Sequence, residues 1–240
     1  MTALPGLVTV FAQNGLSQET FNADKCPGNN GICAGWILQH FGDYWTPLLQ
    51  HVVLSVVPLV VGFLIATVLA ILAHRQRWLQ TPLLVFVTIL FTIPSIAAFL
   101  ILIPLIGFGT TTAFVALTAY TLVLIYRNVI SGLGGVPRSS VEAAQGMGLS
   151  PNQILWGVEF PLALPTILAG VRIAASSTVG IAGFAFFAGA GGLGRSINES
   201  FSFRGNVLAA GLLMVLLAAV LELGVLVIQK LLTPWERAAR

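Results

Sequence analysis

The sequence of 240 residues has few charged side chains, and this shortage limits the kinds of protein it can encode. Asp, Glu, Lys and Arg together make up 8% of the chain, whereas soluble domains carry about a quarter. Hydrophobic residues reach 57%, 25 glycines stand outside that count, and the mean hydropathy is +0.94. One core cannot hide so much apolar surface, so most of it must face lipid. Soluble domains, nucleic-acid-binding proteins and cytosolic enzymes are thereby excluded.

Histidine is also scarce, which argues against catalysis and metal binding. The three histidines are scattered along the chain, and Ser176-Ser177 have no base beside them. Neither a metal-binding set nor an activated nucleophile is therefore expected. No catalytic residue, metal or cofactor is assigned to this chain.

Apolar runs long enough to cross a membrane dominate the sequence after residue 50. About 20 apolar residues cross the roughly 30 Å hydrocarbon layer as an α-helix. We therefore predict an all-α polytopic membrane protein with five transmembrane helices. Four runs are clear, at residues 52–73, 82–106, 112–131 and 207–232. The fifth lies between Pro161 and Leu193, where crowded prolines predict a bent lead-in before a span of roughly 173–189.

The distribution of basic residues predicts the orientation, because Lys and Arg in short loops mark the cytoplasmic face. One side carries seven of them and the other side three: Arg75, Arg77, Arg127, Arg138, Lys230, Arg237 and Arg240 against Lys25, Arg195 and Arg204. The N-terminus is thus expected outside and the C-terminus inside. The chain divides into an extracytoplasmic segment (1–47), a transmembrane domain (48–232) and a cytoplasmic tail (233–240).

Both cysteines lie in the N-terminal segment. Cys26 and Cys33 bracket a run of Pro, Gly and Asn that is typical of a turn. Two interpretations stay open, a disulfide in an oxidising outer compartment and a pair of free thiols. Two ligands alone do not make a zinc site.

The most informative segment is a polar loop between the third and fourth spans, residues 132–160. Its pattern predicts two short helices. Ser139 and Glu142 have the spacing of a capping box for the first helix, and Gly146 or Gly148 allows a left-handed stop. Ser150 caps the second helix, with Pro151 at its first position and Gln153 returning to the cap.

Five positions of this loop follow a fixed spacing: Glu142, Ala143, Ala144, Gly148 and Pro161. In this spacing the loop resembles the EAA loop of ABC importer permeases, with Val158 and Phe160 as conservative departures. We therefore call residues 132–160 the coupling loop. The resemblance implies that this loop docks on a separate ATPase subunit, with Glu142, Ala143, Ala144 and Gly148 as the contact set. Glu142 has a second interpretation, as a helix cap with no partner contact.

The resemblance extends over most of residues 48–234 to the osmoprotectant permeases, which handle glycine betaine, choline, carnitine or proline betaine. The matching runs are Thr92 to Ser95, Tyr126 to Asn128, Pro161 to Pro165, Ala169 to Arg172 and Gly189 to Gly194. Membership implies a type I ABC importer domain like that of methionine permeases. It also implies two ATPase subunits that use ATP and Mg, an external binding protein, and a second permease chain, identical or a paralogue. An importer of another small solute, such as an amino acid, is the alternative. A secondary carrier is disfavoured because no internal repeat is present.

Several residues are candidates for the pathway or its gate. Pro94 and Ser95 lie in mid-span, where a proline bends a helix, although a packed kink without a transport role is equally consistent. Gly191 and Gly192 belong to a glycine-rich run at the outer mouth, a gate or a docking surface for the binding protein. Phe184 and Phe187 are candidates for contact with a passing cation, although lipid-facing or packed rings are more common.

Two ionisable residues lie inside spans. A lone charge at that depth costs about 2.5–3.5 kcal/mol on insertion scales. At 1.5 Å per helical residue, Arg172 and Glu222 are both very roughly 15 Å above the inner boundary. We therefore predict an Arg172–Glu222 ion pair. The alternative places Arg172 in water at the lead-in and Glu222 in a cavity.

Overall fold

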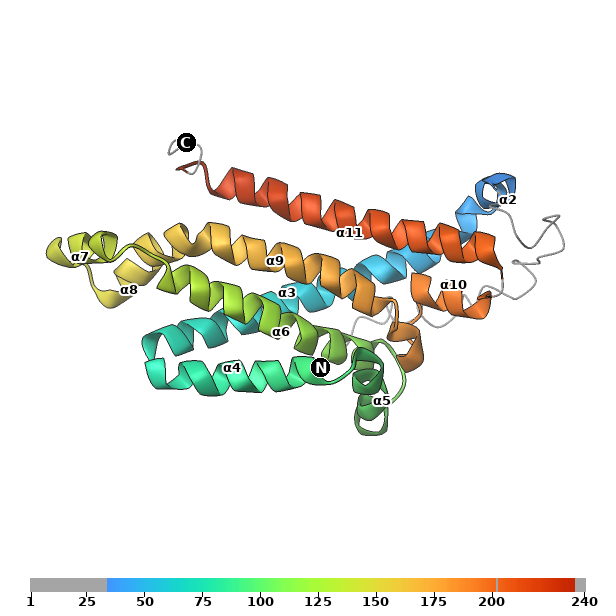
Figure 1. The fold of residues 1–240 in the computed structure, drawn as a ribbon, viewed down its shortest axis with the longest axis horizontal. Helices are drawn as coiled ribbons and strands as arrows, with labels where there is room; N and C mark the ends of the chain where they lie inside the picture. Colours follow the sequence, from blue (N-terminus) through green and yellow to red (C-terminus); the bar gives the residue numbers. More distant parts are fainter. Residues whose placement is uncertain (1–33, 202, 236–240) are drawn as a thin grey trace, which may run out of the picture. The chain divides into compact units, whose positions relative to one another are not determined.

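A computed structural model describes residues 34–201 and 203–235, and within these ranges every regular element is helical (Figure 1). Most of them are α-helices; η3 and η5 are 3-10 turns and η4 is a π turn. In chain order they are α2 (Ala34–Gln39), η3 (Phe41–Tyr44), α3 (Trp45–Arg75), α4 (Arg77–Thr92), α5 (Ser95–Ile106), α6 (Thr110–Gly134), α7 (Arg138–Gly146), α8 (Pro151–Ile154), η4 (Leu155–Glu159), α9 (Phe160–Ala182), η5 (Ala185–Ala188), α10 (Leu193–Glu199) and α11 (Arg204–Leu232).

Four helical stretches are long and apolar enough to cross a membrane. They are Phe41–Arg75, Thr110–Gly134, Pro151–Ala182 and Arg204–Leu232. A fifth span is obtained when α4 and α5 are counted together as one broken span. The predicted all-α class is confirmed, and five spans agree with this count.

The second span is not the continuous rod predicted for residues 82–106. The helix ends at Thr92, and α4 and α5 are bent by 95° at the break. Ile93 has the extended backbone (φ −65°, ψ 125°) that a following proline favours, and Pro94 caps α5. Pro94 is therefore the position at which the helix breaks rather than bends.

The fourth span also differs from the prediction in its bounds. Helix α9 already begins at Phe160 and ends at Ala182, before the predicted end at residue 189. Pro161 lies in the first turn of α9, where the missing N–H would have no partner in any case. The prolines therefore do not prevent α9 from beginning at Phe160. After α9 ends, the short turn η5 follows.

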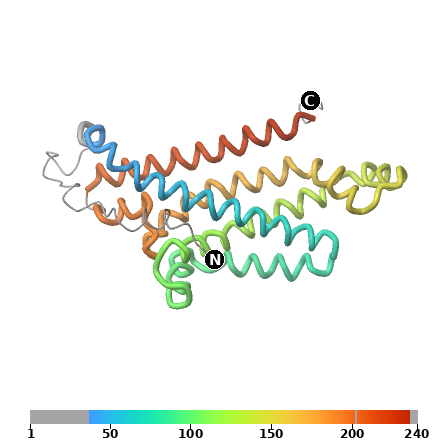
Figure 2. Tube along the Cα trace, turned by 180° about the vertical axis from the view of Figure 1, so that it is seen from behind, coloured from blue at the N-terminus to red at the C-terminus, as the bar shows by residue number. Residues whose placement is uncertain are grey.

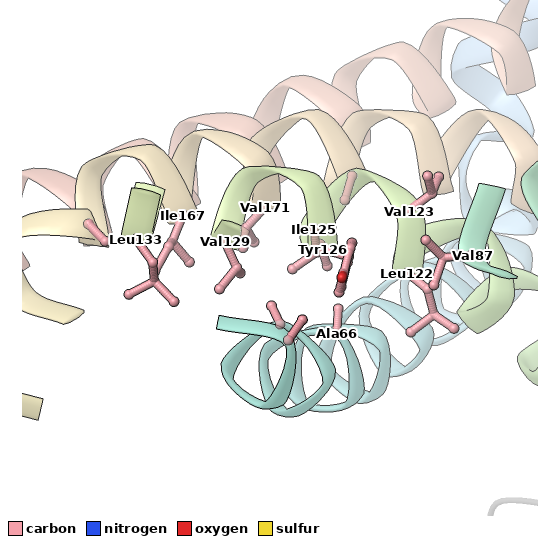
Figure 3. Close-up of a cluster of buried hydrophobic side chains, with 14 of the residues drawn as sticks. Ala66, Val87, Leu122, Val123, Ile125, Tyr126, Val129, Leu133, Ile167 and Val171 are labelled. Carbon is pink, nitrogen blue, oxygen red and sulfur yellow. The ribbon is translucent and has the colours of Figure 1, made fainter. Parts of the chain in front are cut away.

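The described residues fall into two compact units. Within the described ranges, unit 1 comprises residues 34–58, 94–117, 177–201 and 203–219, and unit 2 comprises residues 59–93, 118–176 and 220–235. In unit 2 the chain reverses direction between α3 and α4 (Figure 2). Its core is formed by side chains from α3, α4, α6 and α9, among them Ala66, Val87, Ile125, Tyr126, Val129, Ile167 and Val171 (Figure 3). Unit 1 has two smaller clusters, one around Leu54 and Phe99 and one around Tyr44 and Leu193.

Small residues allow the helices of unit 2 to approach closely, as is common in membrane proteins. A Cβ atom added to Gly170 in α9 would lie 2.3 Å from Cβ of Asn128 in α6. One added to Gly132 would lie 3.0 Å from the backbone oxygen of Ala163. The contact between α6 and α9 therefore depends on glycine at these positions.

Gly170→Ala is expected to destabilise the protein, because the added methyl group overpacks the contact with Asn128 at a cost of about 1–3 kcal/mol. The thermal unfolding of the detergent-purified protein measures this effect. Gly224→Ala is the matched control, since a Cβ atom at helical Gly224 meets nothing within 4 Å. Equal unfolding temperatures for the two variants would contradict the close approach of α6 and α9.

Candidate functional site

The first helix of the coupling loop, α7, begins differently from the prediction. Its N-cap is Pro137, with no capping hydrogen bond from a side chain, and Arg138 is its first residue. Ser139 is thus already inside the helix and Glu142 lies one turn further on, so the predicted Ser139–Glu142 capping box is wrong. The reason is that Pro137 (φ −56°) already has a backbone suited to the residue before a helix.

The turn between α7 and α8 has the predicted features. Gly148 is left-handed (φ 81°), and its N–H donates to the carbonyl of Gln145 at 2.9 Å. The N–H of Leu149 donates to the carbonyl of Ala144 at 3.2 Å, which completes a Schellman stop. The N–H of Ser150 donates to Gln153 Oε1 at 2.8 Å, and Pro151 is the first residue of α8. These bonds fix the angle between the two short helices.

The coupling loop presents only part of the predicted contact set to solvent. Glu142, Ala143 and Gly148 are exposed, whereas Ala144 is fully buried among the residues of its own chain. Ala144 therefore packs α7 onto the body of unit 2. Pro161 is half-buried in the first turn of α9.

Two side chains at the end of α3 hold the coupling loop. His74 Nε2 lies 3.2 Å from Glu159 Oε2, and Arg75 Nη2 donates to Asn152 Oδ1 at 2.5 Å. A cavity of about 440 Å³ lies beside these contacts, with Val141 of α7 among its lining residues. The two contacts join residues that are far apart in the chain: His74 and Glu159 are separated by 85 positions, and Arg75 and Asn152 by 77. Sequence reasoning used Arg75 only for orientation and did not find this connection, because such distant contacts leave no local spacing pattern.

The last part of the coupling loop, which leads into α9, is a π turn, η4. Such turns are rare in proteins, and those that occur are frequently found at functional sites. Glu159, the last residue of η4, is the partner of His74. The end of α3 therefore contacts the irregular turn that joins the coupling loop to the fourth span.

The structure brings Arg172 and Glu222 together. Arg172 Nη2 donates to Glu222 Oε1 at 3.0 Å, with 30% and 44% of the two side chains exposed. Gln229 Nε2 makes a second polar contact in unit 2, to the carbonyl of Pro165 at 3.5 Å. Both contacts join α9 to α11. Arg172 and Glu222 are each other's charged partner, as expected for charges inside a membrane span.

The glycine-rich run after η5 belongs to unit 1, and it is exposed at Gly189 and buried from Ala190 to Gly194. Gly189, Gly191 and Gly192 have positive φ angles of 77°, 78° and 83°. The N–H of Gly192 donates to Gln50 Oε1 at 3.0 Å, and a Cβ atom on Gly191 would lie 2.4 Å from the same oxygen. Gly191 and Gly192 are therefore packed against α3 and do not form an exposed docking surface in this structure.

A polar network in unit 1 holds the segment around α10. Tyr44 donates to Asn206 Oδ1 at 2.5 Å, and Asn206 Nδ2 donates to the carbonyl of Ser196 at 2.6 Å. His51 Nε2 lies 3.0 Å from the carbonyl of Val179. The side chains of Tyr44, His51 and Asn206 are all buried. Their bonds join η3 to the beginning of α11, and the beginning of α3 to the last turns of α9. The sequence suggested an interfacial helix or a surface loop for the segment 36–51, and it did not indicate that Tyr44 and His51 are buried in these contacts.

The remaining candidates are separated from one another. Pro94 is exposed and Ser95 half-buried at the break between α4 and α5. Phe184 (41% exposed) lines a cavity of about 260 Å³ together with Phe186, whereas Phe187 (37% exposed) is not part of that lining and stacks on Phe186 at 4.3 Å. Cys26 and Cys33 lie outside the described residues.

The chain is similar to known membrane transport proteins over most of its length. Residues 59–238 match the family described as binding-protein-dependent transport system inner membrane component. The chain is 37% identical over 206 residues to the osmoprotectant import permease protein OsmW of Salmonella typhimurium, covering 83% of this chain and 96% of OsmW. It is 33% identical over 187 residues to the choline transport system permease protein OpuBB of Bacillus subtilis, covering 77% of this chain and 86% of OpuBB.

A solved structure has the same fold. An inward-facing form of the MetNI methionine ABC transporter superposes with a TM-score of 0.69 at 23% identity, covering 82% of this chain and 98% of the compared chain. This likeness shows the fold alone. It agrees with the predicted type I importer architecture.

The Arg172–Glu222 pair predicts a non-additive pattern in a double-mutant cycle. Arg172→Leu or Glu222→Leu alone leaves one charge without its partner, at a cost of about 2.5–3.5 kcal/mol at a helix centre. The double variant removes both charges, so it is expected to be more stable than the worse single variant. The yield and thermal stability of the detergent-purified protein measure this. A double variant no more stable than the worse single one would show that the pair is not coupled.

Proposed function

Because this chain belongs to the family of binding-protein-dependent transport system inner membrane components, we propose that it is the permease of an ATP-driven importer of osmoprotectant quaternary amines. The solute class comprises glycine betaine, choline, carnitine and proline betaine. The observation that carries this choice is the match to OsmW, a protein named for osmoprotectant import, over 96% of its length. OpuBB, named for choline transport, supports the same class.

The mechanism is alternating access driven by a separate ATPase. As an importer permease of this family, the chain works with ATPase subunits and an external substrate-binding protein. We propose that the exposed Glu142, Ala143 and Gly148 contact the ATPase, while buried Ala144 fixes α7 to the permease. When ATP closes the ATPase subunits, the coupling loop moves with them and the spans turn so that the pathway opens toward the loaded binding protein. Hydrolysis resets the cycle.

The assembly and orientation complete the proposal. A second permease chain, identical or a paralogue, completes the pathway. The N-terminus lies outside and the C-terminus inside, as the seven basic residues against three favour. This orientation places the coupling loop and the contacts of His74 and Arg75 on the cytoplasmic side, where ATP is available.

The solute class is tested with the complete importer in lipid vesicles. With its cognate binding protein, glycine betaine, choline, carnitine or proline betaine is expected to stimulate ATP hydrolysis and to enter the vesicles. Methionine serves as the comparison solute, because the fold resembles that of a methionine transporter. Stimulation by methionine and by none of the quaternary amines would contradict the proposed class.

The coupling role of the loop is tested at Gly148. Gly148→Val forces a β-branched residue into the left-handed region, at a cost of about 1–3 kcal/mol. The Schellman stop is then distorted, so solute uptake per ATP hydrolysed is expected to fall several-fold. Gly146→Val is the matched control, because Gly146 is exposed, helical and without a positive φ angle. Unchanged ATPase-coupled uptake by the Gly148 variant would overturn the coupling role.

A further inference from the structure

The cavity of about 260 Å³ in unit 1 has a lining suited to one class of cation. Phe184, Phe186 and Phe201 contribute aromatic rings, Met214 a thioether and Asn198 an amide. Among the described residues that line it, none is charged. Binding pockets for drug-sized ligands measure about 300–1,000 Å³, so this cavity suits a smaller solute.

From this lining we infer that the cavity between the end of α9, α10 and α11 is a transient binding site for the quaternary ammonium group of the transported solute. The inference rests on the proposed function and deepens it. Ring faces attract a cation electrostatically, and quaternary ammonium groups are bound in this way. A quaternary ammonium has no N–H group, so it needs no hydrogen-bond acceptor. The lining offers few acceptors, which disfavours an amino acid, whose ammonium group carries three donors.

Three glycines line the cavity, Gly180, Gly183 and Gly194, and two of them make close contacts. A Cβ atom on Gly194 would lie 1.7 Å from the carbonyl oxygen of Gly183, and one on Gly183 would lie 2.7 Å from Met214 Cε. Gly180 differs, because a Cβ atom there meets nothing within 4 Å. The wall around Gly183 and Gly194 is thus tightly packed, while open space remains beside Gly180.

The position of α10 makes the cavity accessible to a polar solute. The helix reads Leu-Gly-Arg-Ser-Ile-Asn-Glu, and Arg195 Nε donates to Glu199 Oε1 at 2.6 Å. Such a segment is too polar for the hydrocarbon layer, so this wall of the cavity lies at the level of water. Asn198 is the polar side chain in the lining, and its amide has N–H groups that can donate to a carboxylate or hydroxyl group of the solute.

The first experiment measures binding to the complete importer without its binding protein. Choline is compared with 3,3-dimethylbutan-1-ol, a neutral molecule of the same shape, by the protection each gives against thermal unfolding. Choline is expected to bind more tightly by roughly 2- to 30-fold, the range that a cation–π contact provides. Equal protection by the two molecules would overturn the proposed site, because it would show that the positive charge does not contribute to binding. The cavity would then be an apolar space that an acyl chain can fill.

The second experiment uses variants in the wild-type importer background. Phe184→Leu and Phe201→Leu are expected to weaken choline binding. Gly180→Leu is expected to reduce it as well, because Gly180 lines the cavity and a Cβ atom there meets nothing within 4 Å. Gly224→Leu is the control for Gly180→Leu, because Gly224 is not among the residues that line the cavity and a Cβ atom there also meets nothing within 4 Å. Binding and uptake equal to wild type in all three cavity variants would overturn the site.

The two hypotheses fail in different ways. If the wild-type importer takes up quaternary amines while the cavity variants are unaffected, the site is wrong and the proposed function stands. If the wild-type importer takes up no quaternary amine, the proposed function fails and the inferred role of the cavity fails with it.

Discussion

A membrane-spanning chain must satisfy its backbone hydrogen bonds internally, because the hydrocarbon layer offers no water to do so. In this protein most described residues of the apolar runs are accordingly helical, and the departures from regular helix are few. They include the break at Ile93 and Pro94, the π turn η4, and the stretch from Gly183 to Gly192. Two of these departures border segments to which we assign a proposed role: η4 borders α9 at the end of the coupling loop, and the stretch from Gly183 borders the cavity proposed to bind the solute.

The coupling loop illustrates how local bonds and distant contacts combine. Its inner geometry comes from the left-handed Gly148 and from the bond between Ser150 and Gln153. Its attachment to the rest of unit 2 comes from the contacts of His74 and Arg75. A loop fixed in both ways can transmit a displacement to α3 and α9 together, whereas a flexible loop would absorb it.

Much of this arrangement could be predicted from the sequence, because the signals are local. The apolar runs predicted the helices, and the positions of Gly148, Ser150 and Pro151 predicted the turn. Charges inside spans predicted the Arg172–Glu222 contact, since a lone charge there has few alternatives. The prediction was wrong where a neighbouring residue decided the outcome, as Pro137 did for the start of α7. It gave no sign of the His74–Glu159 contact, which joins residues 85 positions apart.

The π turn η4 also has a rotational consequence for the fourth span. A single residue inserted into an α-helix turns everything beyond it by about 100° around the axis, since 3.6 residues make one turn. The face that α9 presents is therefore set by the residue count between Leu155 and Glu159. With one residue fewer in that segment, Arg172 would point away from Glu222 although every side chain of α9 itself was unchanged.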